Sequence, residues 1–342
     1  MQIFHSSQPF ILESGEFLPE LQIAYTTIGK RNADDSNIVW ICHALTANSN
    51  PAEWWSGLVE PGYYFDPEKY FIICANVMGS CYGTTGPLSL NPLTQKKYYH
   101  DFPFVTVRDM VAAHELLREH LNIQKVHTLL GGSLGGQQAV EWAIVQPELF
   151  EHLILVATNA VSSPWGIAFR ESQRLSIEAD STWKENRDDA GSSGLKAARS
   201  IGLLSYRNYE SYVSFQSEND PDKTNLFKAA SYQQYQGEKL VNRFNAFSYY
   251  ILSKAMDSHN VARNRGSLRE ALQGIKAEAL VIGISSDILF PVSEQKLLYT
   301  LIPQSVYAEI NSIYGHDGFL IETIQLTKQI KSFIHSQKNI LA

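Results

Sequence analysis

Short apolar runs alternate with longer amphipathic segments in this chain, and this rhythm limits the possible fold more than any other feature. The runs Asn37–His43, Tyr70–Asn76 and Val126–Leu130 are short and almost continuously apolar. Such runs are typical of strands that are buried on both faces of a sheet. Segments of helical pattern lie between or after them, over Thr106–His120 and Leu134–Gln146. This alternation predicts a mostly parallel central sheet flanked by helices.

The alternation stops midway through the chain and returns near its end. The interrupting stretch is polar, rich in Gln, Ser, Tyr and Arg, and patterned as helices or loops. The rhythm resumes with a strand, a helix, a strand and a final helix, over Ala279–Ile284, Val292–Leu301, Ser305–Ile310 and Gly318–His335. We therefore predict one α/β core, residues 1–157 and 275–342, with a helical lid insertion over residues 158–274. An opening antiparallel pair is expected over Phe10–Leu12 and Leu21–Thr27.

Composition narrows the class of protein. Of the 342 residues, 44% are hydrophobic and 18% charged, which suits a globular chain with a sizeable core. The net charge of −7 argues against non-specific binding to nucleic acid or to an anionic membrane surface. The first residues lack the pattern of a signal peptide, and no apolar run approaches the roughly 20 residues of a membrane span. A cytoplasmic protein without membrane or nucleic-acid partners is expected.

The three cysteines, Cys42, Cys74 and Cys81, are too few and too scattered for a disulfide framework or a zinc site. We find neither metal-ligand spacing nor a phosphate-cradling loop, so neither a metal nor a tightly bound cofactor is expected. Cys42 and Cys74 lie in apolar runs and are expected to be buried. Cys81 lies in a Gly-rich loop, where a role nearer the chemistry stays open.

The segment around Ser133 carries the strongest functional signal. Gly131-x-Ser133-x-Gly135 comes directly after an apolar strand and opens a helix. This is the pattern and the context of a nucleophile elbow, in which a sharp turn exposes the serine oxygen. The turn strains the backbone and needs neighbours without side chains. An ordinary serine in a glycine turn is the alternative, but the strand before and the helix after favour a nucleophile.

A serine hydroxyl needs a base to become a good nucleophile, and two later segments can supply one. Asp287 follows the strand Ala279–Ile284, and His316 lies in a Gly-flanked loop before the last helix. The order Ser, Asp, His on such a sheet is that of the α/β-hydrolase fold. We therefore predict a Ser133–His316–Asp287 triad. Asp287 as a helix N-cap, His316 as a capping loop residue and Asp317 as the acid are the alternatives.

An oxyanion hole should accompany the triad. In this fold it combines the amide after the nucleophile with one from the loop after an early strand. The first amide is that of Leu134, and the second is that of Ala44 or Leu45, of which we choose Leu45. His43 is expected to be structural rather than catalytic.

Several longer stretches resemble the homoserine O-acetyltransferase family. They cover most of the chain and include HALTA (His43–Ala47), EWWSGLVEPG (Glu53–Gly62), CYGTTGP (Cys81–Pro87), GGSLGGQQAVEWA (Gly131–Ala143), GLKAARSIGLLSYR (Gly194–Arg207), YQGEKLVNRF (Tyr235–Phe244) and YGHDGFL (Tyr314–Leu320). The pattern is not matched everywhere. Departures occur at Ala47, at 230–234, at Asn245 and at Phe247, in or near the insertion, and concern the choice of substrates rather than the fold.

The resemblance implies an activity and further site residues. The family transfers an acetyl group from acetyl-CoA, as co-substrate, to the hydroxyl of L-homoserine for methionine synthesis. Its triad falls on Ser133, Asp287 and His316, and two residues that hold the amino-acid substrate fall on Arg199 and Asp317. A guanidinium and a carboxylate complement the charges of a zwitterion.

The resemblance also implies a homodimer formed through the lid. Succinyl transfer, serine as acceptor and, more distantly, a serine esterase remain alternatives.

Overall fold

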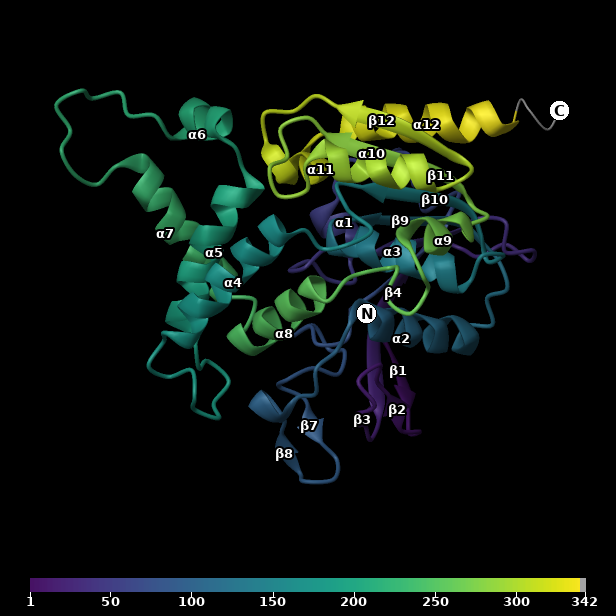
Figure 1. Ribbon diagram of the computed structural model, residues 1–342, viewed down its shortest axis with the longest axis horizontal. Coiled ribbons are helices and arrows are strands. Elements are labelled where there is room, and N and C mark those ends of the chain that lie inside the picture. The colour runs from purple at the N-terminus through teal and green to yellow at the C-terminus, as the bar shows by residue number, and fades with distance from the viewer. Residues whose placement is uncertain (339–342) are drawn as a thin grey trace.

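A computed structural model, which describes residues 1–338, arranges the predicted strands in one eight-stranded sheet (Figure 1). In spatial order its strands are β1 (Gln2–Ser6), β4 (Leu21–Ile28), β6 (Phe71–Ala75), β5 (Ile38–Cys42), β9 (Val126–Gly132), β10 (Phe150–Val156), β11 (Glu278–Ile284) and β12 (Ser305–Ile310). From β6 to β12 all neighbours are parallel, and β4 runs antiparallel to both β1 and β6. The predicted mostly parallel sheet is confirmed.

The prediction for the opening pair was wrong. Leu21–Ile28 pairs with β1, while β2 (Phe10–Ile11) pairs with the nearby β3 (Phe17–Leu18). A tight turn explains the local pairing, because Gly15 adopts a φ of 87° and its amide donates to the carbonyl of Leu12. A second short hairpin joins β7 (Leu90–Asn91) to β8 (Lys96–Lys97).

Both faces of the central strands are buried, which is why these strands read as continuous apolar runs, whereas the edge strands β1 and β12 are partly exposed. Trp40 and Leu129 belong to one core cluster, and their chain neighbours Ile41 and Leu130 belong to a second. Successive side chains of a strand point to opposite faces, so each strand feeds both clusters. The first cluster includes residues of α2 (Val107–His120), α3 (Leu134–Val145) and α10 (Val292–Leu301), and the second includes residues of α11 (Gly318–Ile321) and α12 (Thr323–Lys338).

Capping side chains mark the start of several helices. Thr106 caps α2, in a capping box that Asp109 completes. The final helix was predicted as one element, but the backbone of Glu322, with ψ at 45°, divides it into α11 and α12. The short helix α1 (Pro51–Trp54) follows β5.

Within residues 1–338, no helix combines the length and the apolar character needed to cross a membrane.

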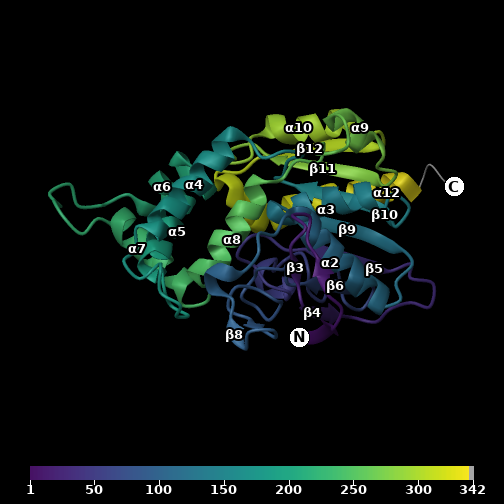
Figure 2. The same cartoon turned by 60° about the horizontal axis from the view of Figure 1, so that its bottom comes forward.

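The stretch between β10 and β11 is helical, as predicted. It contains α4 (Pro164–Glu178), α5 (Ser192–Tyr206), α6 (Tyr209–Gln216), α7 (Lys228–Val241), α8 (Ala246–Asp257) and α9 (Leu268–Gln273). Figures 1 and 2 show α4–α8 gathered to one side of the sheet, with α6, α7 and their connecting loop farthest out. The short α9 instead lies beside α10. Whether residues 158–274 form a separate unit stays a prediction.

Candidate active site

Ser133 occupies a strained turn between β9 and α3. Its backbone has φ 56° and ψ −125°, in the left-handed region that residues with a side chain rarely adopt. The turn is held by two hydrogen bonds, from the amide of Ser133 to the carbonyl of Val156 (3.0 Å) and from Thr158 Oγ1 to the carbonyl of Ser133 (2.8 Å). Strain that the surrounding structure enforces in this way is typical of functional sites.

The flanking glycines are required by space as well as by conformation. A Cβ atom on Gly131 would lie 2.1 Å from the carbonyl oxygen of Gly135. A Cβ atom on Gly135 would lie 2.0 Å from the carbonyl oxygen of Cys42. Both positions therefore exclude any other residue without movement of the backbone, which is the physical basis of the Gly-x-Ser-x-Gly pattern.

The three predicted triad residues lie in one hydrogen-bonded chain. His316 Nε2 is 2.9 Å from Ser133 Oγ, and His316 Nδ1 is 2.6 Å from Asp287 Oδ2. Gly315, with φ at 62°, turns the loop that presents the imidazole, and its amide donates to Ser286 Oγ (3.0 Å). The ring of Phe290 stacks on the imidazole with centroids 5.0 Å apart. This arrangement can take a proton from the serine hydroxyl as the hydroxyl attacks a carbonyl.

Asp287 is oriented by its own loop. Its side chain is fully buried, and Oδ1 accepts the amides of Leu289 (2.8 Å) and Phe290 (2.9 Å) while Oδ2 faces the imidazole. The N-cap position of α10 is held by Pro291, so Asp287 is not the cap of that helix. Asp317, the alternative acid, turns to a different partner described below.

The charge of Asp287 favours the protonated form of the His316 imidazole. Burial of His316 lowers its pKa, but the charge of the Asp287 carboxylate and the hydrogen bond to it raise the pKa. The attraction outweighs burial, so the pKa of His316 lies above its ordinary value of 6.5. The geometry therefore stabilises the imidazolium that forms when the serine proton is taken.

The two residues predicted to form an oxyanion hole both lie near Ser133. Leu134 opens α3 directly after Ser133, and Leu45 lies in the loop after β5 and lines the same cavity as Ser133. His43 fixes the second amide indirectly: its Nε2 accepts the amide of Val77 (3.0 Å), so its Nδ1 carries the proton donated to the carbonyl of Ala44 (2.8 Å). Because a trans peptide is planar, the N–H of Leu45 points away from that carbonyl and from His43.

His43 is thus a structural residue in the way the sequence indicated. Burial lowers the pKa of its imidazole to about 4, which keeps the ring neutral and this tautomer in place at neutral pH.

A cavity of about 450 Å³ opens over Ser133. The core contributes Leu45, His316 and Asp317 to its wall, and the helices between β10 and β11 contribute Arg199 of α5 among others. The two residues predicted to hold a zwitterion, Arg199 and Asp317, therefore both line the cavity that contains Ser133. Their opposite charges can bind a carboxylate and an ammonium of one small molecule.

Arg199 and Asp317 differ in whether their charged groups already have partners within the protein. Among residues 1–338, Arg199 Nε is buried without a hydrogen-bond partner, and the guanidinium lies 5.3 Å from the centroid of the Tyr206 ring. A buried donor without a partner is unusual and suits a ligand-binding group. Asp317 Oδ2 pairs with Arg207 Nε at 3.0 Å. Burial raises the pKa of the Asp317 carboxyl, and this effect outweighs the lowering of the pKa by the charges of Arg207 and Arg199.

Sequence reasoning missed two residues that line this cavity and one that lies behind its wall. Arg207, the partner of Asp317, lies inside a stretch quoted above but carried no separate signal. Arg243 and Tyr82 both line the cavity, and Arg243 Nη1 donates to the Tyr82 hydroxyl (2.7 Å) across 161 positions of sequence. Contacts between such distant positions leave no local pattern.

The cavity wall includes Tyr82 and not its neighbour Cys81 among the described residues. The thiol of Cys81 donates to the carbonyl of Arg243 (3.7 Å), and burial raises its pKa to about 11. A protonated thiol is a weak nucleophile, so the possible role of Cys81 in the chemistry finds no support in the structure.

Comparison with known proteins agrees with this fold. Residues 37–323 match a family model described as the alpha/beta hydrolase fold. The eight-stranded sheet, the strained serine turn and this match together place the chain among proteins of the α/β-hydrolase fold.

Individual relatives narrow the class further. The chain is 52% identical over 332 residues to a homoserine O-acetyltransferase of Cyclobacterium marinum, covering 97% of this chain and 94% of the relative. It is 45% identical to a homoserine O-acetyltransferase of Chlorobaculum parvum, covering 96% and 93%. A crystal structure of homoserine O-acetyltransferase from Bacillus anthracis superposes with a TM-score of 0.89 at 26% identity, covering 97% and 96%. The chain belongs to the homoserine O-acetyltransferase family.

Proposed function

We propose that this protein is a cytoplasmic homoserine O-acetyltransferase, which moves an acetyl group from acetyl-CoA to the hydroxyl of L-homoserine. The observation that carries the proposal is the Ser133–His316–Asp287 chain, with contacts of 2.9 and 2.6 Å, at a cavity that also holds Arg199 and Asp317. A nucleophile and a zwitterion-binding pair at one cavity suit transfer to an amino acid. The relatives named homoserine O-acetyltransferase support the same substrate.

The first half-reaction acetylates the enzyme. Ser133 Oγ attacks the thioester carbonyl while His316 Nε2 takes the hydroxyl proton, and the amides of Leu134 and Leu45 stabilise the oxyanion. The carbonyl re-forms, the C–S bond breaks, and the imidazolium returns its proton to the sulfur of CoA. Asp287 orients the imidazole and stabilises its charged form without taking the proton.

The second half-reaction transfers the acetyl group. Arg199 binds the carboxylate of homoserine and Asp317 its ammonium, which directs the hydroxyl to the acetyl-serine. His316 takes the hydroxyl proton as the oxygen attacks the acetyl carbon. The bond between that carbon and Ser133 Oγ then breaks, and the imidazolium returns its proton to Oγ. No tightly bound cofactor is needed in this scheme.

The insertion over residues 158–274 acts as a lid in this proposal. Arg170, Gln173, Tyr206 and Met256 all come from it and line the cavity. Such a wall limits the access of water, whose attack on the acetyl-enzyme would give acetate instead of product.

We expect loss of the acceptor site to slow the second half-reaction selectively. Arg199→Ala should slow transfer from acetyl-enzyme to homoserine by roughly thirty-fold to several thousand-fold, since losing one partner of a buried charge pair costs about 2–5 kcal/mol. Acetylation by acetyl-CoA should change far less. Single-turnover kinetics, with homoserine added to preformed acetyl-enzyme, separate the two steps.

Arg187→Ala is the matched control, because Arg187 is an exposed arginine of the same insertion and lies on its surface. If Arg199→Ala slowed acetylation as much as transfer, Arg199 would belong to the donor site or the scaffold, and its acceptor role would be wrong.

The acetylation rate should depend on the ionisation of His316. The imidazole accepts a proton only when neutral, so acetylation falls as the pH drops through its pKa. Because that pKa is raised, the midpoint should lie above 6.5. Acetylation measured in single turnovers between about pH 5 and 9 tests this. A rate that is flat over this range, or a midpoint below 6.5, would contradict His316 as the base.

We further propose a homodimer formed through the insertion. Large apolar side chains of α6, α7 and their loop are exposed, led by Tyr209 (83%), Leu226 (77%) and Tyr235 (61%). Exposed apolar side chains on neighbouring elements such as α6 and α7 suit an interaction surface. Light scattering should give the mass of two chains, and Leu226→Asp combined with Tyr235→Asp should shift the protein toward one chain. A wild-type protein of one chain's mass at micromolar concentration would contradict the dimer.

One experiment decides the substrates. Acetyl-CoA and succinyl-CoA are each combined with homoserine or serine, and the release of CoA is followed. We expect acetyl-CoA with homoserine to be fastest. Succinyl-CoA or serine giving the fastest release would correct the donor or the acceptor.

Ester hydrolysis is the second candidate function. An acetyl esterase, MekB, superposes with a TM-score of 0.84 at 25% identity, covering 97% of this chain and 94% of that one. CoA release that is independent of any acceptor, accompanied by acetate, would favour hydrolysis.

A further inference from the structure

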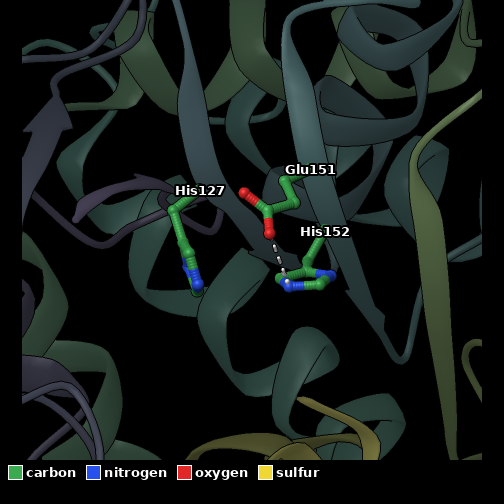
Figure 3. Close-up of side chains that lie close together, drawn as sticks. All are labelled: His127, Glu151 and His152. Atoms are coloured by element: carbon green, nitrogen blue, oxygen red, sulfur yellow. Dashed lines mark ion pairs between the residues drawn. The ribbon is translucent and has the colours of Figure 1, made fainter. Parts of the chain in front are cut away.

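Two histidines and a glutamate meet near the amino-terminal ends of two central strands, whereas the active site lies at the carboxyl-terminal ends. His127 is the second residue of β9, and Glu151 and His152 are the second and third residues of the parallel neighbour β10. Ser133 follows the other end of β9, six residues and therefore about 20 Å away. One potential ligand atom from each of the three residues lies within 4.8 Å of the other two. Figure 3 shows the Glu151 carboxylate between the two imidazole rings.

The contacts of the rings suit metal ligation. His127 Nδ1 lies 2.8 Å from Thr128 Oγ1, so Nε2 is the nitrogen with which His127 can bind an ion. His152 Nε2 is 3.7 Å from Glu151 Oε1, and its Nδ1 is 3.5 Å from Glu278 Oε2. Histidine ligands commonly direct their second ring nitrogen to a hydroxyl, carbonyl or carboxylate, which orients the ring. Thr128 stands in that position for His127, and the Glu278 carboxylate lies 3.5 Å away on the corresponding side of His152.

Burial and charge are also compatible with an ion. The His152 side chain is 6% exposed, which holds its ring in place, whereas Glu151 is 41% exposed and can adjust. Lys125 Nζ now pairs with Glu151 Oε2 at 3.2 Å. Lys125 is itself 55% exposed, and exposed pairs of this kind contribute little, so a divalent cation can displace it.

We propose that His127, Glu151 and His152 bind a divalent transition-metal ion, with Zn²⁺ as the best fit. Two imidazole nitrogens and one carboxylate oxygen, with water as fourth ligand, make a common tetrahedral zinc set. Zinc bonds of about 2.0–2.2 Å place tetrahedral ligand atoms about 3.4 Å apart. The 3.7 Å between His152 Nε2 and Glu151 Oε1 is close to this separation, and on binding the ion the ligand atoms of the three residues, which lie within 4.8 Å of one another, move closer together. The ion would join the first residues of β9 and β10 and stabilise the folded chain.

The sequence predicted no metal site because its ligands share no local spacing. His127 and the Glu151-His152 pair are 24 positions apart and meet only through the pairing of parallel strands.

Metal binding to the full chain, first freed of metal with a chelator, tests the proposal. Equilibrium dialysis should give one Zn²⁺ per wild-type chain, and Co²⁺, as a spectroscopic probe, should give the visible absorption of a tetrahedral site. Glu151→Gln and His127→Gln should each weaken Zn²⁺ binding at least about tenfold. Glu148→Gln is the matched control, since Glu148 is an exposed carboxylate three residues away that pairs with Lys276. It should bind Zn²⁺ as the wild type does.

A second measurement is independent of affinity. Saturating Zn²⁺ should raise the thermal midpoint of the wild type and of Glu148→Gln by a few degrees, and that of Glu151→Gln by less. The absence of stoichiometric binding, or binding that survives unchanged in both site variants, would overturn the proposal. Acetyl transfer plays no part in either readout, so the outcome is separate from that of the proposed function.

Discussion

Replacing Ser133 with alanine is expected to abolish acetyl-enzyme formation and to lower the turnover rate by about 10⁶-fold, as loss of the nucleophile does in other triad enzymes. The expected loss is large because the Oγ atom forms the covalent bond, and the structure offers His316 Nε2 no other hydroxyl at 2.9 Å within residues 1–338. The fold should survive. Alanine keeps the Cβ atom, so the strain of the turn at φ 56° is no greater than before.

Intact-protein mass spectrometry after mixing with acetyl-CoA measures the effect. The wild type should gain one acetyl group, and Ser133→Ala should gain none. Ser172→Ala, an exposed serine of α4, serves as the control and should behave as the wild type. An acetyl adduct of equal yield on the Ser133→Ala protein would show that another residue is the nucleophile.

Asp287→Asn should cost about 10⁴-fold in the acetylation rate, because the substitution changes the tautomer of the imidazole and leaves its position intact. Oδ1 of Asp287 accepts two backbone amides, so the oxygen of an asparagine would stay on that side. Its NH₂ group would then face His316 Nδ1 and donate to it. The ring proton would move to Nε2, where it blocks acceptance of the serine proton.

Asp317→Asn is the matched comparison, since it makes the same chemical change beside the same histidine. It should impair transfer to homoserine and leave acetylation nearly intact. If Asp287→Asn stayed within tenfold of the wild type while Asp317→Asn lost acetylation, the triad acid would be Asp317. Stopped-flow measurement of CoA release in a single turnover distinguishes the two results.

The central strands of the sheet were predictable because both of their faces are buried. The run Asn37–His43, for example, has polar residues only at its two ends. The strand β5 (Ile38–Cys42) begins and ends one residue inside it. The opening hairpins were not predictable in the same way. Phe10–Ile11 had two possible partners, and the choice depended on a turn at Gly15 that the apolar pattern does not register.

The residues of the candidate site also fall into those that the sequence could predict and those that it could not. Ser133, Asp287 and His316 each follow a strand or precede a helix, so the chain order and the fold were enough to select them. Arg199 and Asp317 came only from the resemblance, since a charged residue on a polar helix or at a helix start has no distinctive pattern. Arg207 beside Asp317, and Arg243 beside Tyr82, depend on contacts between elements that are distant in the sequence.

The central claim is that the acetyl group passes from CoA to homoserine through Ser133. It is tested most directly by forming the enzyme with isotopically labelled acetyl, removing free acetyl-CoA, and adding homoserine. Mass spectrometry then follows the label on the peptide that contains Ser133 and in the small-molecule fraction. The account predicts that the label leaves this peptide only slowly in buffer, and that with homoserine it leaves quickly and appears in O-acetylhomoserine. Release as acetate at one rate with or without homoserine, or label that never resides on Ser133, would contradict it.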